Sequence, residues 1–112
     1  MPSAPLANLK VVDLSTVLAG PNCARYLADF GAHVIKVENP HTGDSLRGMA
    51  WRDPRDGKGL WWKLVNRNKQ TIAADLKSPN DLQLIKDLID EADVLIENFR
   101  PGVLERLGLH PE

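Results

Sequence analysis

The feature that most constrains the fold of this chain is the alternation of short apolar runs with helix-like segments. Four runs rich in β-branched and apolar residues have the length and pattern of strands: residues 9–14, 33–38, 70–76 and 93–97. Helical patterns separate most of them. Strands that alternate with helices form right-handed crossovers and a mainly parallel sheet. The pattern therefore predicts an α/β fold of three layers.

Local signals define where the main helices begin and end. Pro21 suits the first position of a helix, and Gly31 supplies a left-handed stop. In the second helix, Ser78 is a plausible N-cap, Pro79 follows it, and Asp81 stands three residues after the serine. An apolar stripe then continues through Leu82, Ile85, Leu88 and Ile89. Two shorter helices are expected at residues 60–65 and 101–107.

Composition limits the function classes. The 112 residues fit one globular domain, and 14 basic against 15 acidic residues give a net charge of −1 without a basic half. Nucleic acid and membrane surfaces are therefore disfavoured as partners. The single Cys23 cannot form an internal disulfide, no apolar run approaches a membrane span, and no signal sequence is recognisable. These features predict a cytoplasmic protein.

Ligands of parallel α/β sheets lie beyond the carboxyl ends of the strands. In this sequence those ends carry residues 15–21, 38–40, 76–77 and 97–100. The polar segment 39–59 is too long for an ordinary connection, and segments of that kind are usually functional or mobile. We therefore expect a ligand site at this edge of the sheet.

A dinucleotide site is disfavoured there. Glu38 closes the second strand near the place where an acid would bind a ribose, but the first turn, STVLAGPNC, lacks the GxGxxG pattern. Pro21 follows the single Gly20 and removes a backbone N–H that a phosphate would need. The alternative for Glu38 is a solvated strand end.

Other candidate residues each have a structural alternative. The helix dipole could activate Cys23, although a small packing residue is the favoured interpretation. The histidines are scattered and predict no metal site: His33, His41 and His110. Three tryptophans could stack on an adenine, line a subunit interface or pack in the core: Trp51, Trp61 and Trp62. Four basic residues could meet phosphates or be solvated: Arg47, Arg67, Lys69 and Lys77.

Four longer strings resemble the family III (CaiB/BaiF) CoA-transferases in order and spacing. They are LKVVDLSTVLAGP, LADFGAHVIKVENPHTGDSLRG, NRNKQTIAADLKSP and ADVLIENFRPGVLERLGL, and they cover nearly the whole chain. The resemblance implies a Rossmann-like, three-layer domain with a mainly parallel sheet that is incomplete in this chain. It also implies that residues 1–112 are the amino-terminal CoA-binding portion of a longer CoA-transferase that forms an interlocked homodimer.

The resemblance implies contacts with coenzyme A at three strand ends and on the last helix. Leu18 and Ala19 match first-turn positions whose backbone meets CoA. Asn39 stands where relatives often carry an arginine against the adenine, and an amide lacks the charge and stacking plane of a guanidinium. The other matched positions are Ala74, Asp75, Leu76, Lys77, Asn98, Phe99, Arg100 and Arg106.

Two of these positions have competing interpretations. Phe99 could instead pack under a loop as an ordinary hydrophobic residue. Arg106 could instead form a surface ion pair with Glu105 or Asp93.

Catalysis is expected to depend on a residue beyond Glu112. In the family an Asp carboxylate attacks the acyl-CoA thioester, forms a mixed anhydride, and passes CoA to an acceptor carboxylic acid through an aspartyl-CoA thioester. No Asp of this chain stands in the matching motif, so no catalytic residue is assigned and the 112 residues alone are expected to be inactive. Asp13 is expected to be a buried structural carboxylate held by backbone donors.

Two alternatives remain open at this point. One is a fragment of an enzyme like α-methylacyl-CoA racemase, which has the same fold but moves a proton, although the VLAGP turn looks more like the transferases. The other is a non-catalytic module that binds CoA or a nucleotide. The sequence does not identify the acyl-CoA or the acceptor acid.

Overall fold

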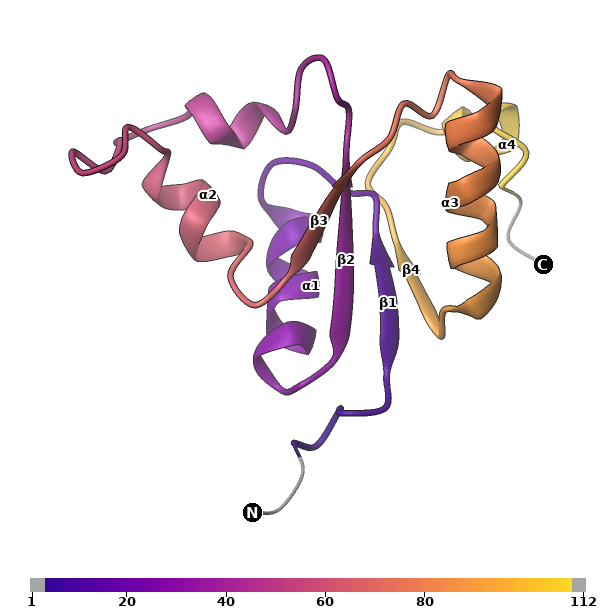
Figure 1. Cartoon of the computed structure of the whole chain (residues 1–112), viewed down its shortest axis with the longest axis horizontal. Coiled ribbons are helices and arrows are strands. Elements are labelled where there is room, and N and C mark those ends of the chain that lie inside the picture. The colour runs from indigo at the N-terminus through magenta and orange to yellow at the C-terminus, as the bar shows by residue number, and fades with distance from the viewer. Residues whose placement is uncertain (1–3, 110–112) are drawn as a thin grey trace.

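The computed structural model describes residues 4–109 and has the predicted α/β architecture (Figure 1). Four strands form one sheet: β1 (Lys10–Asp13), β2 (His33–Glu38), β3 (Gln70–Ala73) and β4 (Val94–Ile96). The helices are α1 (Ala19–Asp29), α2 (Leu60–Val65), α3 (Pro79–Glu91) and α4 (Val103–Arg106), with a 3₁₀ turn, η1, at Ser45–Gly48.

The sheet is parallel throughout and has the order β3-β2-β1-β4. Val11 of β1 pairs with Val34 of β2 on one side and with Val94 of β4 on the other. The chain runs outward from β1 to β3 and then crosses back to place β4 beside β1. Such a reversal creates a topological switch point, where ligands of open α/β sheets bind beyond the carboxyl ends of the strands.

Two hydrophobic clusters cover opposite faces of the sheet. Val11 and Val34 pack with Ala24 and Ala28 of α1. On the other face, Val12, Leu14, Val37 and Ala74 pack with Ile85 of α3. Figure 1 shows the result, with α1 on one side of the strands and α3 and α4 on the other. The predicted three layers are confirmed.

The helix signals are confirmed in kind, and some bounds differ. Helix α1 begins at Ala19, so Pro21 occupies its third position, where a missing N–H is still harmless. Gly31 has a φ of +105°, as a left-handed stop requires. Ser78 is the N-cap of α3, but its side chain makes no capping hydrogen bond, and Asp81 accepts from the N–H of Asp75 instead. Strand β3 ends at Ala73, three residues earlier than predicted.

The long polar connection between β2 and β3 is anchored by two buried side chains. Leu46 in η1 is fully buried, and Asp53 is 1% exposed. Arg55 and Lys63 form ion pairs with Asp53, and their hydrogen bonds hold the pKa of Asp53 well below its usual range. The segment is thus held by ion pairs between its own residues, and with α2 it packs on the side of the sheet that carries α1.

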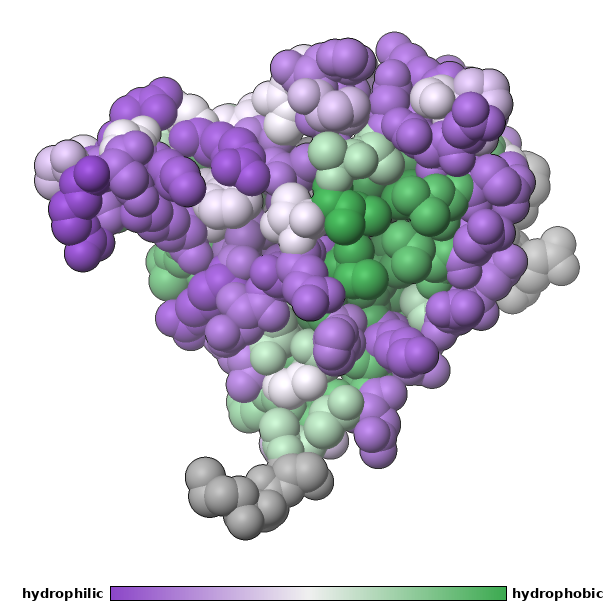
Figure 2. Space-filling model, in the orientation of Figure 1, coloured by the Kyte–Doolittle hydropathy of each residue, from purple (hydrophilic) through white to green (hydrophobic). Residues whose placement is uncertain are grey.

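Hydrophobic side chains gather between the sheet and α3, on the face turned toward the viewer in Figure 2. The cluster on this side of the sheet includes partly buried Ile72, Leu76 and Leu88. Because these side chains are only partly buried, this part of the core is covered only in part on the face shown. None of the helices described is both long and apolar enough to cross a membrane.

Candidate functional site

A cavity of about 320 Å³ lies at the carboxyl ends of the four strands. Each strand end contributes to its wall, and α4 closes one side. The lining residues are Leu14 and Thr16 after β1, Val37 to Asn39 and Thr42 to Asp44 at β2, Ala74 to Lys77 after β3, Phe99 after β4, and Val103 and Leu107. Its volume falls in the range of small-molecule sites, roughly 300–1,000 Å³, and its place is the one that the fold favours.

Six of the residues expected to meet CoA lie together in this cavity: Asn39, Ala74, Asp75, Leu76, Lys77 and Phe99. Ala74 is buried, and Phe99 is half-buried: it packs against the cluster under α3 and also lines the cavity. The N–H of Lys77 donates to Asp75 Oδ1 at 3.0 Å, and the N–H of Asp75 donates to Asp81 Oδ2 at 2.9 Å. These bonds turn the chain after β3 along the cavity wall.

The other expected positions lie outside this cavity. Leu18 and Ala19 border a second hollow, of about 420 Å³, which α2 lines with Trp61 and Leu64. Arg100 is exposed between β4 and α4.

Arg106 is also exposed, on α4. The ion pair considered for it is absent from the described part of the chain, where Asp93 accepts from the N–H of Lys10.

Asn98 is bonded to the first turn. Its Nδ2 donates to the carbonyl of Thr16 at 2.7 Å, and its Oδ1 accepts from the N–H of Thr16 at 3.0 Å. This reciprocal pair joins the end of β4 to the turn after β1, across the switch point of the sheet. Asn98 thus contacts the turn that carries Leu18 and Ala19.

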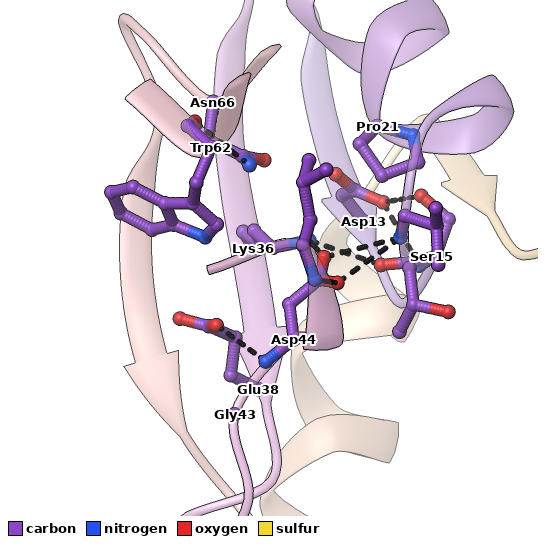
Figure 3. A network of polar contacts seen from close by, with 12 residues as sticks. Asp13, Ser15, Pro21, Lys36, Glu38, Gly43, Asp44, Trp62 and Asn66 are labelled. Atoms are coloured by element: carbon purple, nitrogen blue, oxygen red, sulfur yellow. Dashed lines mark hydrogen bonds and ion pairs between the residues drawn. The ribbon is translucent and has the colours of Figure 1, made fainter. Parts of the chain in front are cut away.

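A buried polar network lies on the opposite side of the strand ends, toward α1 (Figure 3). Lys36 is fully buried, its Nζ lies 2.9 Å from Asp44 Oδ2, and it donates to the carbonyl of Ser15 at 3.0 Å. Asp44 Oδ1 also accepts from the N–H groups of Val17 and Leu46, at 3.1 and 3.0 Å. A lysine and an aspartate from neighbouring segments thus hold the turn after β1.

A second buried ion pair, between Lys69 and Asp13, lies next to the same turn. Lys69 Nζ donates to Asp13 Oδ2 at 2.9 Å, to the carbonyl of Pro21 at 2.8 Å and to Asn66 Oδ1 at 2.8 Å. Burial lowers the pKa of Lys69 even though Asp13 opposes that shift. The expectation that Asp13 is a buried carboxylate is confirmed, with Ser15 N–H as a backbone donor. The phosphate interpretation is wrong for Lys69, because its side chain is fully enclosed.

Glu38 is likewise enclosed and is not a solvated strand end. Arg47 donates to both of its carboxylate oxygens, at 2.8 and 2.7 Å, and the N–H of Asp44 donates to Oε1 at 2.9 Å. Burial raises the pKa of Glu38, but the hydrogen bonds from Arg47 and Asp44 outweigh it, so the pKa lies below its ordinary value. These bonds occupy both oxygens of the Glu38 carboxylate.

Arg47 also stacks on Trp62, with its guanidinium carbon 3.8 Å from the ring centroid. Because Glu38 and Trp62 already engage its guanidinium group, Arg47 is not free to bind a phosphate. The other tryptophans are not core residues, since Trp51 is 70% exposed and Trp61 is 39% exposed. Arg67 is engaged by Asp29, 2.8 Å away.

Cys23 is exposed on α1, so its interpretation as a packing residue is wrong. The helix turns Ala24 and Ala28 to the sheet instead, because those positions are one turn apart. His33 and His41 are exposed, and His110 lies outside the described residues. Residues 4–109 contain no group of His, Cys, Asp and Glu that could hold a metal ion.

Sequence reasoning missed the Lys36–Asp44 pair, which is central to the site. The alternation in residues 33–38 places Lys36 and Glu38 on one face, yet charged residues on a strand normally indicate a solvated face. The partners come from the long polar segment, at Asp44 and Arg47. The available signal was a lysine and a glutamate on one face of a strand, each followed within about ten residues by a residue of opposite charge.

Comparisons with known proteins agree with this architecture. The family model described as CoA-transferase family III matches residues 6–112. A succinyl-CoA–D-citramalate CoA-transferase of Chloroflexus aurantiacus is 47% identical over 96% of this chain and 27% of its own length. A formyl-CoA:oxalate CoA-transferase of Afipia carboxidovorans is 43% identical over 92% of this chain and 24% of the relative. The chain thus spans about a quarter of the length of these curated relatives.

Solved structures show the same relation in three dimensions. A CAIB/BAIF family protein from Brucella suis superimposes with a TM-score of 0.89 at 39% identity, over 98% of this chain and 30% of that structure. A hypothetical protein from Mycobacterium tuberculosis gives a TM-score of 0.87 at 37% identity, over 99% of this chain and 30% of its own. Sequence and fold agree, and the chain belongs to CoA-transferase family III.

Proposed function

We propose that residues 1–112 form the amino-terminal, CoA-binding portion of an acyl-CoA:carboxylate CoA-transferase. The observation that carries this proposal is the cavity at the carboxyl ends of the strands, where Asn39, Ala74 to Lys77 and Phe99 meet. These residues come from three separate strand ends, and they match the positions at which the family resemblance implies contacts with CoA.

The chemistry of the cavity suits an anionic ligand with apolar parts. Leu14, Val37, Leu76 and Phe99 offer apolar contact to an adenine ring or a pantetheine arm. The carboxylates of Glu38 and Asp44 would repel phosphates if they were free, but Arg47 and Lys36 neutralise them. The third carboxylate of the wall, Asp75, accepts from the N–H of Lys77.

Lys77, Arg100 and Arg106 follow the ends of β3 and β4, and none of the three forms an ion pair among residues 4–109. They are the proposed partners of the phosphates.

In the proposed reaction, this part of the protein binds and orients CoA and a carboxylate elsewhere in the protein acts as the nucleophile. That carboxylate attacks the thioester carbonyl and expels the CoA thiolate, which then attacks the resulting anhydride at the enzyme's acyl carbon and releases the donor acid. An acceptor acid reverses the sequence and leaves as a new acyl-CoA. The similarity to proteins named as CoA-transferases supports this reaction over a racemase. A cytoplasmic homodimer is part of the proposal.

Calorimetric titration of the full-length protein with coenzyme A tests the binding role. Lys77→Ala should weaken binding roughly 10- to 150-fold, because it removes a charge-assisted contact worth about 1.5–3 kcal/mol. Lys58→Ala is a matched control, since Lys58 is also exposed and lies away from the cavity. Absence of CoA binding at millimolar concentration, or equal losses in the two variants, would contradict the proposal.

A second experiment separates the two enzyme classes. The full-length protein is incubated in D₂O with an α-methylacyl-CoA and a panel of carboxylic acids, and products are followed by mass spectrometry. A transferase forms new acyl-CoA esters without deuterium at the α-carbon. Deuterium uptake without exchange of the acyl group would favour the racemase instead.

A further inference from the structure

The turn between β1 and α1 contains a residue in an unfavourable backbone conformation. Val17 has a φ of +69°, in the left-handed region. A β-branched side chain is disfavoured there, because its Cβ branches crowd the backbone, and such a residue persists only where its surroundings hold it. Among residues 4–109, the other non-glycine residues with positive φ are Ala50 and Asn68, neither of them β-branched.

Side chains from other segments bond three successive residues of this turn, Ser15 to Val17. Asp13 accepts from the N–H of Ser15, and Asn98 brackets Thr16. The N–H of Val17 lies 3.1 and 3.3 Å from the two carboxylate oxygens of Asp44. The turn is therefore fixed by side-chain contacts and not by a regular backbone ladder.

Asp44 is suited to this task by its own surroundings. Its side chain is fully buried, and the ammonium of Lys36, also fully buried, lies 2.9 Å from Oδ2. The same ammonium donates to the carbonyl of Ser15. The two members of this ion pair thus bond the turn at two points, Lys36 at the carbonyl of Ser15 and Asp44 at the N–H of Val17.

The turn also requires a close approach at its far end. A Cβ at Gly20 would lie 2.3 Å from Cβ of Ser15, so the start of α1 folds directly onto the start of the turn. Near this point, the N–H groups of Ala19 and Gly20, at the beginning of α1, have no acceptor within residues 4–109. The conformation of Val17 sets the direction in which this segment leaves the sheet.

We propose that Asp44, through its buried ion pair with Lys36, is a positioning residue that stabilises the left-handed conformation of Val17 and so presents the backbone of Leu18 and Ala19 to coenzyme A. This inference rests on the proposed function, because the ligand of that backbone is CoA. Asp44 contacts the turn and also lines the cavity, so the test must distinguish its hold on Val17 from a direct contact with CoA.

The test is a double-variant cycle in the full-length protein, titrated with coenzyme A. Asp44→Asn should weaken CoA binding about tenfold, because the turn is no longer held in the left-handed form. Val17→Gly should recover at least about threefold of that loss in the Asp44→Asn background, since glycine adopts positive φ without steric cost. A role of Asp44 in general stability alone would not produce this rescue.

Two further variants keep the test decisive. Lys36→Met combined with Asp44→Asn removes both buried charges, so it is expected to fold where Asp44→Asn alone leaves a buried lysine without its counter-ion, and to show the same weakened binding. Asp90→Asn is the matched control, because Asp90 is exposed and has no ion pair or hydrogen bond from its side chain in the described structure. It should bind CoA as the parent protein does.

Amide hydrogen exchange of residues 15–20 supplies a readout that does not depend on CoA. Asp44→Asn should speed exchange there at least about tenfold, with no change for Asp90→Asn. Unchanged exchange, parent-like CoA affinity of folded Asp44→Asn, or no rescue by Val17→Gly would each overturn the inference. If the parent protein failed to bind CoA while exchange rose as expected, the proposed function and the CoA part of this inference would fall, and control of the turn by Asp44 would stand.

Discussion

Removal of one buried ammonium group should destabilise the protein far more than the loss of an exposed one. The perturbation is Lys69→Met, which keeps the length and apolar stem of the side chain. In the structure, Lys69 Nζ has three acceptors within 2.9 Å, one of them Asp13, and neither side chain of the pair has any exposed surface. The substitution leaves the carboxylate of Asp13 inside the protein with only the groups of Ser15 as donors.

The magnitude follows from what remains unpaired. Breaking a buried ion pair on one side costs about 3–5 kcal/mol, because the remaining charge keeps its desolvation cost and loses its partner. A difference of this size is a large part of the 5–15 kcal/mol that stabilises a typical domain. At about 2–4 °C per kcal/mol in a protein of a few hundred residues, the melting temperature should fall by roughly 6–20 °C.

Calorimetric melting of the full-length protein measures this effect, with Lys58→Met as the matched control. Lys58 is exposed and its side chain has no ion pair among the residues described, so its replacement should change the melting temperature by less than about 2 °C. Adding Asp13→Asn to Lys69→Met should recover part of the loss, since no buried charge is then left alone. If the single and double variants melt alike, or Lys69→Met matches the control, the reasoning about the buried charge is refuted.

Three further outcomes are expected. Gly20→Ala should destabilise the protein by about 1–3 kcal/mol and lower the melting temperature by several degrees, because its Cβ would lie 2.3 Å from Cβ of Ser15. Gly48→Ala should be tolerated, since its Cβ would have no neighbour closer than 3.7 Å, and equal effects of the two variants would contradict the close approach. Arg47→Lys should cost about 1 kcal/mol, seen as a lower melting temperature, because lysine gives up the two-point contact with Glu38 and the stacking on Trp62; an unchanged melt would count against it. Because the pKa of Glu38 in the folded protein lies below 4.5, its contribution to folding stability is present above about pH 4.5 and is lost as the pH falls through the folded pKa. The difference in stability between the parent and Glu38→Gln should therefore narrow on acidification, and a constant difference would exclude this coupling of protonation to folding.

The fold was predictable because its signals are local. The strand runs at residues 10–13 and 33–38 are short and β-branched, and stop and start signals such as Gly31 and Ser78 act within one turn of the chain. The alternation of these elements then restricts the topology to a parallel sheet. The length of β3 was overpredicted because residues after Ala73 keep an apolar pattern while they turn along the cavity.

The site was only partly predictable, because its central contacts are not local. The residues of the cavity wall follow strand ends, so their convergence at one edge could be expected from topology. Burial of Lys36 could not, since the pattern of one strand does not reveal that Asp44 will fold back over it. Lys69 illustrates the same limit, because its partner Asp13 lies 56 residues earlier in the chain.

The pairing of charges shows how a chain with a net charge of −1 can leave single cations without an acidic partner at one edge of the sheet. Three carboxylates near the carboxyl ends of the strands have a cationic partner on the α1 side of the sheet: Asp13, Glu38 and Asp44. Their charges are neutralised in ion pairs that hold the first turn and the end of β2.

On the cavity side, Asp75 turns one carboxylate oxygen to the N–H of Lys77, while the side chain of Lys77 stays exposed. Arg100 and Arg106 are exposed beyond β4. The charges that form ion pairs thus lie on the α1 side of the sheet, whereas Lys77 is exposed at the cavity. The net charge of the chain reveals neither group. An overall charge near zero therefore argues against a general polyanion surface, as the sequence suggested, while leaving room for a phosphate-bearing ligand at one edge of the sheet.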